Sequence, residues 1–504
     1  MIGRRSFLRS ASTALAVGSV VGPSGLRRAT ADCTGATIGD GALLRLRSRV
    51  SGQVILPTDV GYGSARLLYN KRFDPHPLAI VRAADESDVA RTIEFARVNG
   101  VRLAVRSGGH SYIGASGCDG VILDLSLMNG VAPLGGSGFR IGSGTQLQHV
   151  YGDLRCNGNW TLPCGSCDTV GFGGIAQGGG FGYLQREHGL TCDRVRSARV
   201  VLADGSAVDA SPDADADLLW AIRGGGGGSF GVVTHFDVEA VPFRRIRVVG
   251  WYWPLTAADD AMSHFHAVSA SGVLPRNVTA ALVFNSSSAA LAPAQCLGLV
   301  FCTGTDAEAD AAVSLFVGPG GLRKTPGLGF AYDAATPACD PTAPYLRDYY
   351  RAKSSMVFGA PAPDTGSVLR QWITDRIGDP RFAAGDPGSI NILTLSGAVG
   401  DTPAGDTAFR HRDAVLEVQY LGFLSVPTAV SISANDAWLR GLYQSAAPRF
   451  STSGAGCYVN YADDDLPESE WPALYWGDNY ARLQDTKRRV DPANVFRGRQ
   501  TVRL

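Results

Sequence analysis

Apolar and polar positions along residues 78–154 follow the periods of strands and helices, and glycines separate the segments. Short apolar runs predict buried strands, whereas Val89, Ile93 and Ala96 share one face at helical spacing and predict an amphipathic helix. The predicted elements are strands at 78–84, 101–106 and 121–128, a helix at 84–100, and a strand that turns through Gly144 into a helix at 139–154. This mixture predicts an α+β fold.

The pattern continues to about residue 242 and then changes. Residues 195–210 predict two strands that turn at Asp204-Gly205, and a helix ending in DLLWAIR follows. Residues 243–455 alternate longer strands with helices, which predicts a second domain with an antiparallel sheet covered by helices. Its predicted strands include 246–253, 280–284, 296–304, 389–397 and 414–423, and its predicted helices include 306–317 and 435–445. Residues 456–504 return to short motifs and end in a predicted helix at 477–490.

The first 31 residues have the features of an export signal. Arg4 and Arg5 stand in GRRSFLR, a weakly apolar stretch of small residues follows, and Ala29-Thr30-Ala31 forms a cleavage signal. This stretch is shorter and richer in Ser and Gly than the about 18–20 apolar residues of a membrane anchor. We therefore expect a twin-arginine signal peptide at 1–31, a secreted or extracytoplasmic mature protein, and no membrane span.

The charge and the cysteines narrow the possible partners. With 46 basic and 46 acidic residues, the chain gives no electrostatic reason to expect nucleic acid or an anionic surface as partner. The basic run at 487–489 is interpreted as a solvated helix face. Ten cysteines in an exported chain are compatible with disulfides, whose pairing cannot be read from spacing. Cys164 and Cys167 form a C-x-x-C without a second half, so we expect no metal site.

A glycine run at 224–228 raises two alternatives. Gly227 to Gly231 match the G-x-S-x-G pattern of serine hydrolases around Ser229, but that pattern needs a strand before the serine and a helix after it. Here a predicted helix precedes and a predicted strand follows, which speaks against a hydrolase. The run also opens no helix, as a dinucleotide fingerprint would require. Glycine turns spread over 150 residues fit an extended cofactor lying across many backbone amides better.

A single histidine follows two glycines in VRSGGHSYIGAS, residues 105–116. Glycines allow a positive φ and the close approach of a flat ligand, so the next side chain can be directed at that ligand. His110 is therefore a candidate reactive group. The alternative is a glycine turn between two strands with an incidental polar histidine.

Five ordered motifs resemble those of the FAD-linked oxidases of the berberine-bridge-enzyme type, in the vanillyl-alcohol-oxidase flavoprotein superfamily. They are SGGHS at 107–111, C-x-x-V-G-x-G-G followed by GGGFG at 167–182, RGGGGGSFGVVT, YVNYADDDL at 458–466, and WGDNYARLQ with DPANVF. The likeness covers about residues 70–240 and 456–504. It implies a PCMH-type FAD-binding domain of two subdomains at 32–242, a substrate-binding domain at 243–455, and a segment at 456–504 that completes the FAD domain.

The resemblance also implies a doubly attached FAD. In the family the histidine of the SGGH loop is bonded to the flavin 8α carbon and the cysteine of C-x-x-V-G to flavin C6, and these positions are His110 and Cys167 here. An imidazole and a thiolate are also the side chains able to add to an electron-poor ring, and a thiol in a glycine-rich loop is accessible enough to ionise. Cys164 is a competitor that lies three residues early. The expected cofactor-binding residues are His110, Cys167, Arg106, Ser107, Gly108, Gly109, Ser111, Val170, Gly171, Gly174, Gly178, Gly179, Gly180 and Asn460.

The same resemblance assigns catalytic roles. The second tyrosine of Y-x-N-Y in the family takes the substrate hydroxyl proton, which falls on Tyr461, with Tyr458 and Asn460 in support or against the flavin. The alternative is that both tyrosines only pack against the ring. A valine at the position of Val170 goes with oxidase behaviour. Glu417, a catalytic candidate, and Gln419 alternate with apolar residues and point either into a cleft or to a solvated sheet face.

The expected reaction is hydride transfer from an alcohol or hemiacetal carbon of a sugar or glycosylated metabolite to FAD, with O₂ reduced to H₂O₂. Sugar-oxidising relatives often carry a tyrosine or an acid on the strand that reads NILTLSGAVG here, and residues 391–400 have neither. This departure points to a different or bulkier alcohol. Oxidative cyclisation or C–C bond formation on a secondary metabolite, a hydrolase, and a flavin-retaining binding protein are the alternatives.

Overall fold

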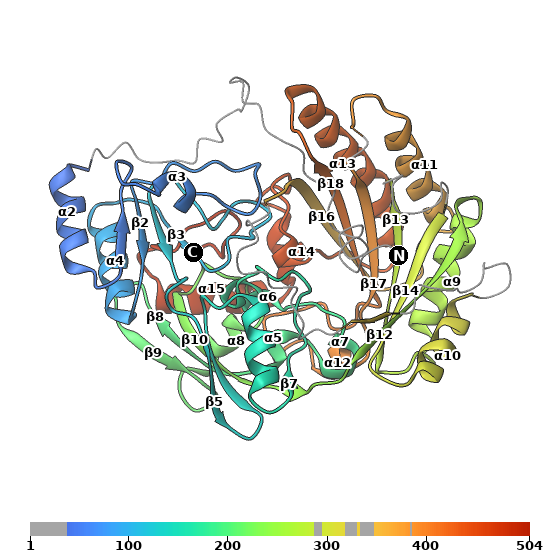
Figure 1. Cartoon of the computed structure of the whole chain (residues 1–504), viewed down its shortest axis with the longest axis horizontal. Coiled ribbons are helices and arrows are strands. Elements are labelled where there is room, and N and C mark those ends of the chain that lie inside the picture. Colours follow the sequence, from blue (N-terminus) through green and yellow to red (C-terminus); the bar gives the residue numbers. More distant parts are fainter. Residues whose placement is uncertain (1–37, 287–294, 318–329, 333–346, 384–385) are drawn as a thin grey trace.

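Three main β-sheets, with helices packed on and between them, form the fold (Figure 1). The computed structural model describes residues 38–286, 295–317, 330–332, 347–383 and 386–504. In this part of the chain the sheets have four, five and seven strands, and β7 (Trp160–Thr161) pairs with β11 (Val241–Pro242). The predicted α+β class is confirmed. The predicted signal peptide lies outside the described residues.

The first sheet has the order β1-β2-β4-β3. Its elements are β1 (Gln53–Ile55), β2 (Ala79–Arg82), β3 (Leu103–Arg106) and β4 (Val121–Asp124), with helices α2 (Asp40–Arg49), α3 (Tyr62–Ala65) and α4 (Glu86–Val98). β4 runs parallel to both of its neighbours, and β1 is antiparallel to β2. The Asp85 side chain caps α4 by accepting from the Asp88 amide, and the helix buries the predicted face of Val89, Ile93 and Ala96.

The second sheet is antiparallel and has the order β5-β6-β10-β8-β9. Its strands are β5 (Val131–Gly135), β6 (Gly138–Gly142), β8 (Val195–Val201), β9 (Ala207–Ala210) and β10 (Val232–Glu239). The helices of this region are α5 (Leu147–Cys156), α6 (Phe172–Gly178), α7 (Gln185–His188), η1 (Thr191–Arg194) and α8 (Ala216–Ile222). Gly205 turns between β8 and β9 with φ +89°, so the predicted strand pair is confirmed.

The C-terminal segment returns to the second sheet. It contains η3 (Val459–Tyr461), α14 (Trp471–Trp476) and α15 (Asn479–Val490). Trp471, Trp476 and Leu483 from this segment share one apolar core with Phe139 and Ile141 of β6. Burial of these large side chains removes apolar surface from water and holds the end of the chain against residues more than 300 positions earlier.

The third sheet is antiparallel and has the order β15-β12-β14-β13-β17-β18-β16. Its strands are β12 (Ile246–Pro254), β13 (Val278–Asn285), β14 (Gln295–Cys302), β15 (Phe330–Tyr332), β16 (Tyr349–Val357), β17 (Gly388–Thr394) and β18 (Leu416–Leu424). The helices are η2 (Leu255–Ala257), α9 (Ala258–Ala270), α10 (Asp306–Val317), α11 (Thr365–Gly378), α12 (Ala398–Asp401) and α13 (Ala429–Phe450).

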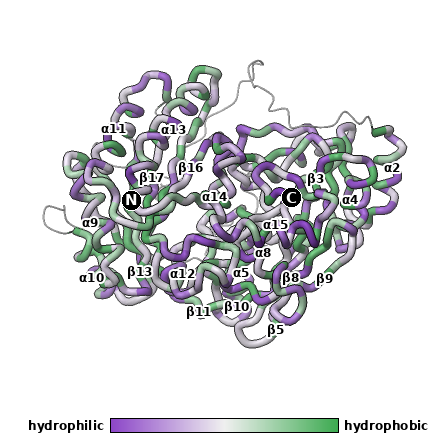
Figure 2. The backbone as a smooth tube through the Cα atoms, turned by 180° about the vertical axis from the view of Figure 1, so that it is seen from behind, coloured by the Kyte–Doolittle hydropathy of each residue, from purple (hydrophilic) through white to green (hydrophobic). Residues whose placement is uncertain are grey.

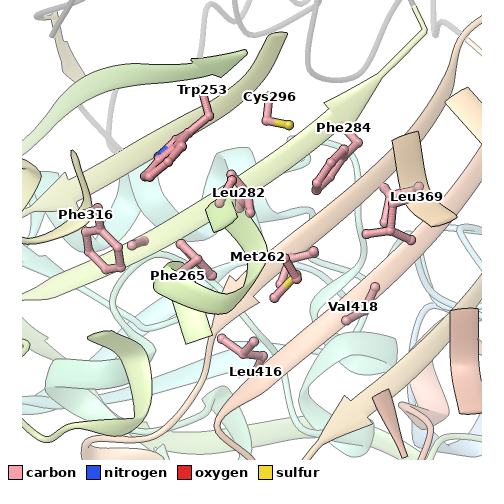
Figure 3. Close-up of a cluster of buried hydrophobic side chains, with 14 of the residues drawn as sticks. Trp253, Met262, Phe265, Leu282, Phe284, Cys296, Phe316, Leu369, Leu416 and Val418 are labelled. Carbon is pink, nitrogen blue, oxygen red and sulfur yellow. The ribbon is translucent and has the colours of Figure 1, made fainter. Parts of the chain in front are cut away.

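Helices α9, α10, α11 and α13 cover the face of this sheet that points away from the two smaller sheets (Figure 1). Between them lies a core in which Met262 and Phe265 of α9 meet Leu282 and Phe284 of β13 (Figure 3). The prediction of an antiparallel sheet covered by helices is confirmed. The opposite face of the sheet is left to form part of the site.

Two features differ from the sequence expectations. Strand β16 was not predicted, because Arg351 and Lys353 interrupt its apolar pattern, yet the whole strand is buried. Lys487 does not belong to a solvated helix face. Its side chain is fully buried, and Nζ donates to Asp491 Oδ2 at 2.6 Å and to the Ser229 carbonyl at 2.8 Å. The acceptors of this buried lysine are supplied by the folded protein, so the sequence around it does not distinguish it from an exposed lysine.

Hydrophobic and hydrophilic residues alternate along most of the backbone (Figure 2). Among the described residues, none of the helices combines the length and the apolar composition needed to cross a membrane.

No disulfide joins any two of the eight cysteines that the structure describes, and Cys33 and Cys339 lie outside the described residues.

Candidate active site

The histidine loop leaves strand β3 and is tied to the protein at its base. Arg106 ends β3, and its guanidinium donates to Asp124 Oδ2 at 2.6 Å and to the Ala65 carbonyl at 2.7 Å. Ser107 Oγ donates to the Ser143 carbonyl at 2.5 Å. Further on, Ser111 Oγ accepts from the Ala115 amide at 3.0 Å. These three predicted cofactor-binding residues therefore make protein contacts that shape the loop.

Two loops cross at a pair of glycines. A Cβ on Gly108 would lie 2.2 Å from the Gly171 nitrogen, and a Cβ on Gly171 would lie 1.9 Å from Ser107 Oγ. Gly109 next to it has φ +74°, which favours glycine. This close approach brings the histidine loop against the loop that carries Cys167.

His110 lies between a ring and a hydroxyl. Its Nε2 is 2.8 Å from Thr169 Oγ1, and its imidazole stacks on the ring of Tyr69 with centroids 3.9 Å apart and an interplanar angle of 18°. The Tyr69 hydroxyl donates to Asp348 Oδ2 at 2.8 Å. Burial lowers the pKa of His110 to about 3, so the imidazole is neutral at physiological pH.

Cys167 is the accessible cysteine of the C-x-x-C pair. Its side chain is exposed, whereas Cys164 is buried. Desolvation by the surrounding protein raises the pKa of the Cys167 thiol to about 11. The negative charges of Asp168 and Asp348 contribute less to this shift. The thiol is therefore accessible, as predicted, and its raised pKa means that most of it is protonated at neutral pH.

Tyr461 packs against Tyr112 of the histidine loop, and hydrogen bonds connect Tyr112 to Gln419 and Asn391 of the large sheet. Its ring stacks on Tyr112 with centroids 5.0 Å apart and an interplanar angle of 5°. The Tyr112 hydroxyl accepts from Gln419 Nε2 at 2.6 Å, and Gln419 Oε1 accepts from Asn391 Nδ2 at 3.3 Å. Burial and, next, the charge of Glu417 raise the pKa of Tyr461 well above its ordinary value.

Glu417 lies one position before a buried valine on β18 and is itself 3% exposed. No described residue donates a hydrogen bond to its Oε1. Burial raises the pKa of this carboxyl well above its ordinary value. A buried carboxyl oxygen without a donor is costly unless it serves a ligand or a proton transfer.

Tyr458 and Asn460 hold the end of helix α6. The Tyr458 hydroxyl accepts from the Gly180 amide at 2.7 Å and from Asn460 Nδ2 at 2.8 Å, and its ring stacks on Phe181. A Cβ on Gly178 would lie 2.1 Å from Asn460 Oδ1. Gly179 and Gly180 have φ values of +131° and +91°. Tyr458 is 2% exposed, and its ring meets that of Tyr461 edge-on with centroids 4.9 Å apart.

Of the remaining predicted residues, Val170 lies on the cysteine loop and Gly174 lies in helix α6, which follows it. The Val170 carbonyl accepts from the Leu147 amide at 2.9 Å, and its side chain packs against the core of the second sheet. A Cβ on Gly174 would meet nothing within 4 Å, so open space adjoins the backbone there. Ser229, the hydrolase candidate, is buried, and its Oγ accepts from the Val502 amide. Helix α8 precedes it and β10 follows, as predicted, so it does not form a nucleophile elbow.

Sequence reasoning missed four residues of this site, namely Tyr69, Tyr112, Thr169 and Tyr350. The Tyr350 ring meets Tyr112 edge-on with centroids 5.2 Å apart. Tyr112 lies next to the predicted Ser111 and Thr169 next to the predicted Val170, so a search along the motif loops would have found them. Tyr69 and Tyr350 carry no local signal.

Comparisons with known proteins agree with this architecture. A family model described as FAD binding domain matches residues 77–211, and one described as berberine and berberine like matches residues 457–503. A chitooligosaccharide oxidase from Gibberella zeae is 30% identical over 460 residues, which cover 86% of this chain and 89% of the relative. An aclacinomycin-N/aclacinomycin-A oxidase from Streptomyces galilaeus is 29% identical, with 86% of each chain covered.

Solved structures extend the likeness to the whole fold. A glucooligosaccharide oxidase from Acremonium strictum with a 6-S-cysteinyl, 8α-N1-histidyl FAD matches with a TM-score of 0.81 at 23% identity. The match covers 92% of this chain and 99% of that chain, and it supports the predicted PCMH-type arrangement. Together with the 30% identical relative, these findings show that the chain belongs to the berberine-bridge-enzyme-like family of FAD-linked oxidoreductases.

Proposed function

We propose that this protein is an oxidase that takes hydride from an alcohol or hemiacetal carbon of a sugar or glycosylated metabolite, with FAD attached at His110 and Cys167. O₂ takes up the electrons as H₂O₂. The observation that carries this proposal is geometric: a neutral imidazole and an accessible thiol lie on adjoining loops, and the histidine loop also places Tyr112 against the ring of Tyr461.

The residues of the site fit FAD. The cysteine loop carries an accessible thiol, and open space adjoins Gly174 in helix α6, which follows this loop. Tyr112 and Tyr461 offer a partly buried, uncharged aromatic surface of the kind that packs against a flat ring system. When bound, FAD supplies the hydride acceptor, and the protein supplies orientation and electrostatics. The division into 32–242 with 456–504 around FAD, and 243–455 over the substrate, is part of this proposal.

Tyr461 is the proposed proton acceptor for the substrate hydroxyl. Its raised pKa keeps the phenol protonated at neutral pH, so the reactive phenolate is scarce but strongly basic. Glu417 lies within electrostatic reach and sets how readily Tyr461 loses its proton. Tyr458 and Asn460 position the segment by their bonds to helix α6.

The substrate side is polar near the tyrosines. Asn391 on β17 and Gln419 on β18 present linked amide groups, which can donate to and accept from sugar hydroxyls. The names of the relatives include an oxidase of chitooligosaccharides and one of aclacinomycins, which supports a carbohydrate-bearing substrate. The absence of a tyrosine or an acid at 391–400 favours a substrate other than a plain oligosaccharide.

The test is to mix the purified protein without oxygen with a panel of neutral oligosaccharides, amino-sugar oligosaccharides and glycosylated aromatic metabolites. We expect one class to bleach the flavin absorbance and to give a product that has lost two hydrogens as a new carbonyl or lactone. Admitting O₂ should restore the absorbance and release one H₂O₂ for each product. A product with a new ring instead of a carbonyl would establish oxidative cyclisation, and bleaching by no member would contradict the proposed substrate class.

Export by the twin-arginine route completes the proposal. Arg4, Arg5 and the Ala29-Thr30-Ala31 signal support it, because this route carries folded proteins that have taken up a cofactor inside the cell. Changing both Arg4 and Arg5 to Lys should retain the protein inside the cell, with uncleaved mass. Export of the doubly changed chain at the level of the unchanged one would contradict this route.

A further inference from the structure

We propose that Thr169 is a positioning residue that selects Nδ1 of His110 as the nitrogen through which FAD is attached. This inference rests on the proposed attachment at His110. Thr169 is not one of the residues that the family motifs assign, and it touches the imidazole directly, with Oγ1 2.8 Å from Nε2.

A neutral imidazole carries its proton on one nitrogen and a lone pair on the other. When Nε2 carries the proton and donates it to Thr169 Oγ1, the lone pair lies on Nδ1. Burial of His110 favours this neutral state. A threonine hydroxyl can also reverse its role and donate to Nε2 once that nitrogen has lost its proton. The same contact therefore suits the imidazole before and after a bond forms at Nδ1.

Tyr69 restricts the plane of the imidazole, and Thr169 selects one of the two flipped orientations that share this plane. The two rings stack at 3.9 Å, and the Tyr69 hydroxyl is anchored to Asp348 on the chain that enters β16. A half-turn of the ring about its bond to Cβ would keep the stack but would move Nε2 away from Oγ1. The hydrogen bond to Thr169 thus distinguishes two orientations that stacking alone leaves equal.

Thr169 is two residues beyond Cys167, so the loop that carries one attachment residue also directs the other. The Gly108–Gly171 crossing holds the two loops in register, since any side chain at either position would collide with backbone. The positioning of His110 is therefore a property of both loops together.

The chemistry of attachment balances with the oxidant of the proposed function. A bond forms between Nδ1 and the 8α carbon, that carbon loses one hydrogen, and the imidazole loses its proton from Nε2. The two hydrogens and two electrons pass to the FAD ring system, and O₂ removes them as H₂O₂. Thr169 acts at the Nε2 proton, first as acceptor and then as donor.

The test compares Thr169→Val and Thr169→Ser in two backgrounds of the full chain. In Cys167→Ala, only the histidine bond can form, and in His110→Ala, only the cysteine bond can form. Each purified variant is incubated with FAD in air, and the flavin that stays with acid-precipitated protein is measured over time. Retained flavin is then located by peptide mass, and the attached nitrogen is identified by NMR of the flavin peptide.

We expect Thr169→Val to slow attachment at His110 at least tenfold, to leave attachment at Cys167 within twofold, and to leave non-covalent FAD binding intact. Thr169→Ser should restore attachment at His110, and the parent should be joined through Nδ1. Unchanged attachment at His110 in Thr169→Val, equal loss in both backgrounds, or attachment through Nε2 in the parent would each overturn the inference. Absence of retained flavin in the Cys167→Ala parent would overturn the proposed histidine attachment and this inference with it.

Discussion

Two tyrosines three positions apart have different surroundings and should differ in function. The ring of Tyr461 stacks on Tyr112, whereas the Tyr458 hydroxyl already accepts two hydrogen bonds from the protein. Tyr461→Phe should lower kcat by about 10²–10⁴-fold, the contribution of a positioned general base, while the flavin stays bound. Tyr458→Phe should lower kcat far less, because it removes two supporting hydrogen bonds and no proton acceptor. Steady-state kinetics with the substrate found in the bleaching panel measures both, and equal losses in the two variants would contradict the assignment.

Glu417 should control the pH at which Tyr461 becomes a base. Burial raises the pKa of Tyr461, and the charge of Glu417 raises it further. Because the phenolate is the active form, kcat/KM should rise with pH, and Glu417→Gln should move this rise to lower pH by removing a nearby negative charge. A pH profile of kcat/KM for both forms measures the shift. Loss of activity at every pH in Glu417→Gln would identify Glu417 itself as the proton acceptor.

At the residue scale the sequence singled out His110 and Cys167 as candidates, because glycine-rich motifs are readable without a structure, and the structure shows that their loops adjoin. It did not reveal the partners Tyr69 and Tyr350, which lie far from any motif and reach the site only through tertiary packing. Nor did it reveal that desolvation by the surrounding protein, with the charges of Asp168 and Asp348, raises the pKa of the accessible Cys167 thiol. Desolvation depends on all surrounding atoms and leaves no local pattern.

At the element scale, strand β16 connects the large sheet to the segment that carries Tyr461. Lys353 Nζ donates to Asp463 Oδ2 at 2.6 Å and to Asp465 Oδ2 at 2.8 Å, immediately beyond η3. Arg351 pairs with Asp465 at 2.8 Å. The Tyr458 amide donates to Ser354 Oγ at 3.0 Å. Strand β16 therefore holds the C-terminal segment by a hydrogen bond as well as by the ion pairs. These contacts fix the position of Tyr461 relative to the sheet.

Removing the Lys353 amine should be costly, because it leaves a buried carboxylate without its partner. Lys353 and Asp463 side chains are 3% and 4% exposed. Lys353→Met should lower the free energy of unfolding by about 3–5 kcal/mol, and Asp463→Asn in the same chain should recover part of the loss. Urea unfolding followed by tryptophan fluorescence measures this.

The matched control is Arg488→Met on α15, whose pair with Asp485 is largely exposed and should contribute little. If Lys353→Met were as stable as Arg488→Met, β16 would not anchor the C-terminal segment through these charges.

The elements that the sequence predicted are those with apolar residues at helical spacing or in a short, mainly apolar run. Helix α4 and strands β2, β4, β8 and β18 were found in this way, with ends displaced by a few residues. Strand β16 was missed, because Arg351 and Lys353 are buried by aspartates more than 100 positions later. A hydrophobic pattern in the sequence identifies buried residues that are apolar. It does not identify charged residues that are buried because a distant part of the chain pairs with them.

At the scale of the whole molecule, the site combines segments that lie far apart in the sequence. Residues 456–504 return across the length of the chain to the second sheet, and Tyr461 arrives beside β16 and the histidine loop. The sequence motifs predicted that this segment completes the first part of the chain, through the family resemblance. No periodicity in the segment itself indicated its partner.

The central claim is that one FAD joins two loops of this chain, and acid denaturation followed by proteolytic digestion tests it most directly. We expect the yellow colour to precipitate with the protein, and one peptide pair, containing His110 and Cys167, to carry the mass of a single flavin. His110→Ala and Cys167→Ala should each retain one bond, and the double variant should release FAD. Flavin free in the supernatant, with unmodified peptides at both positions, would contradict the account.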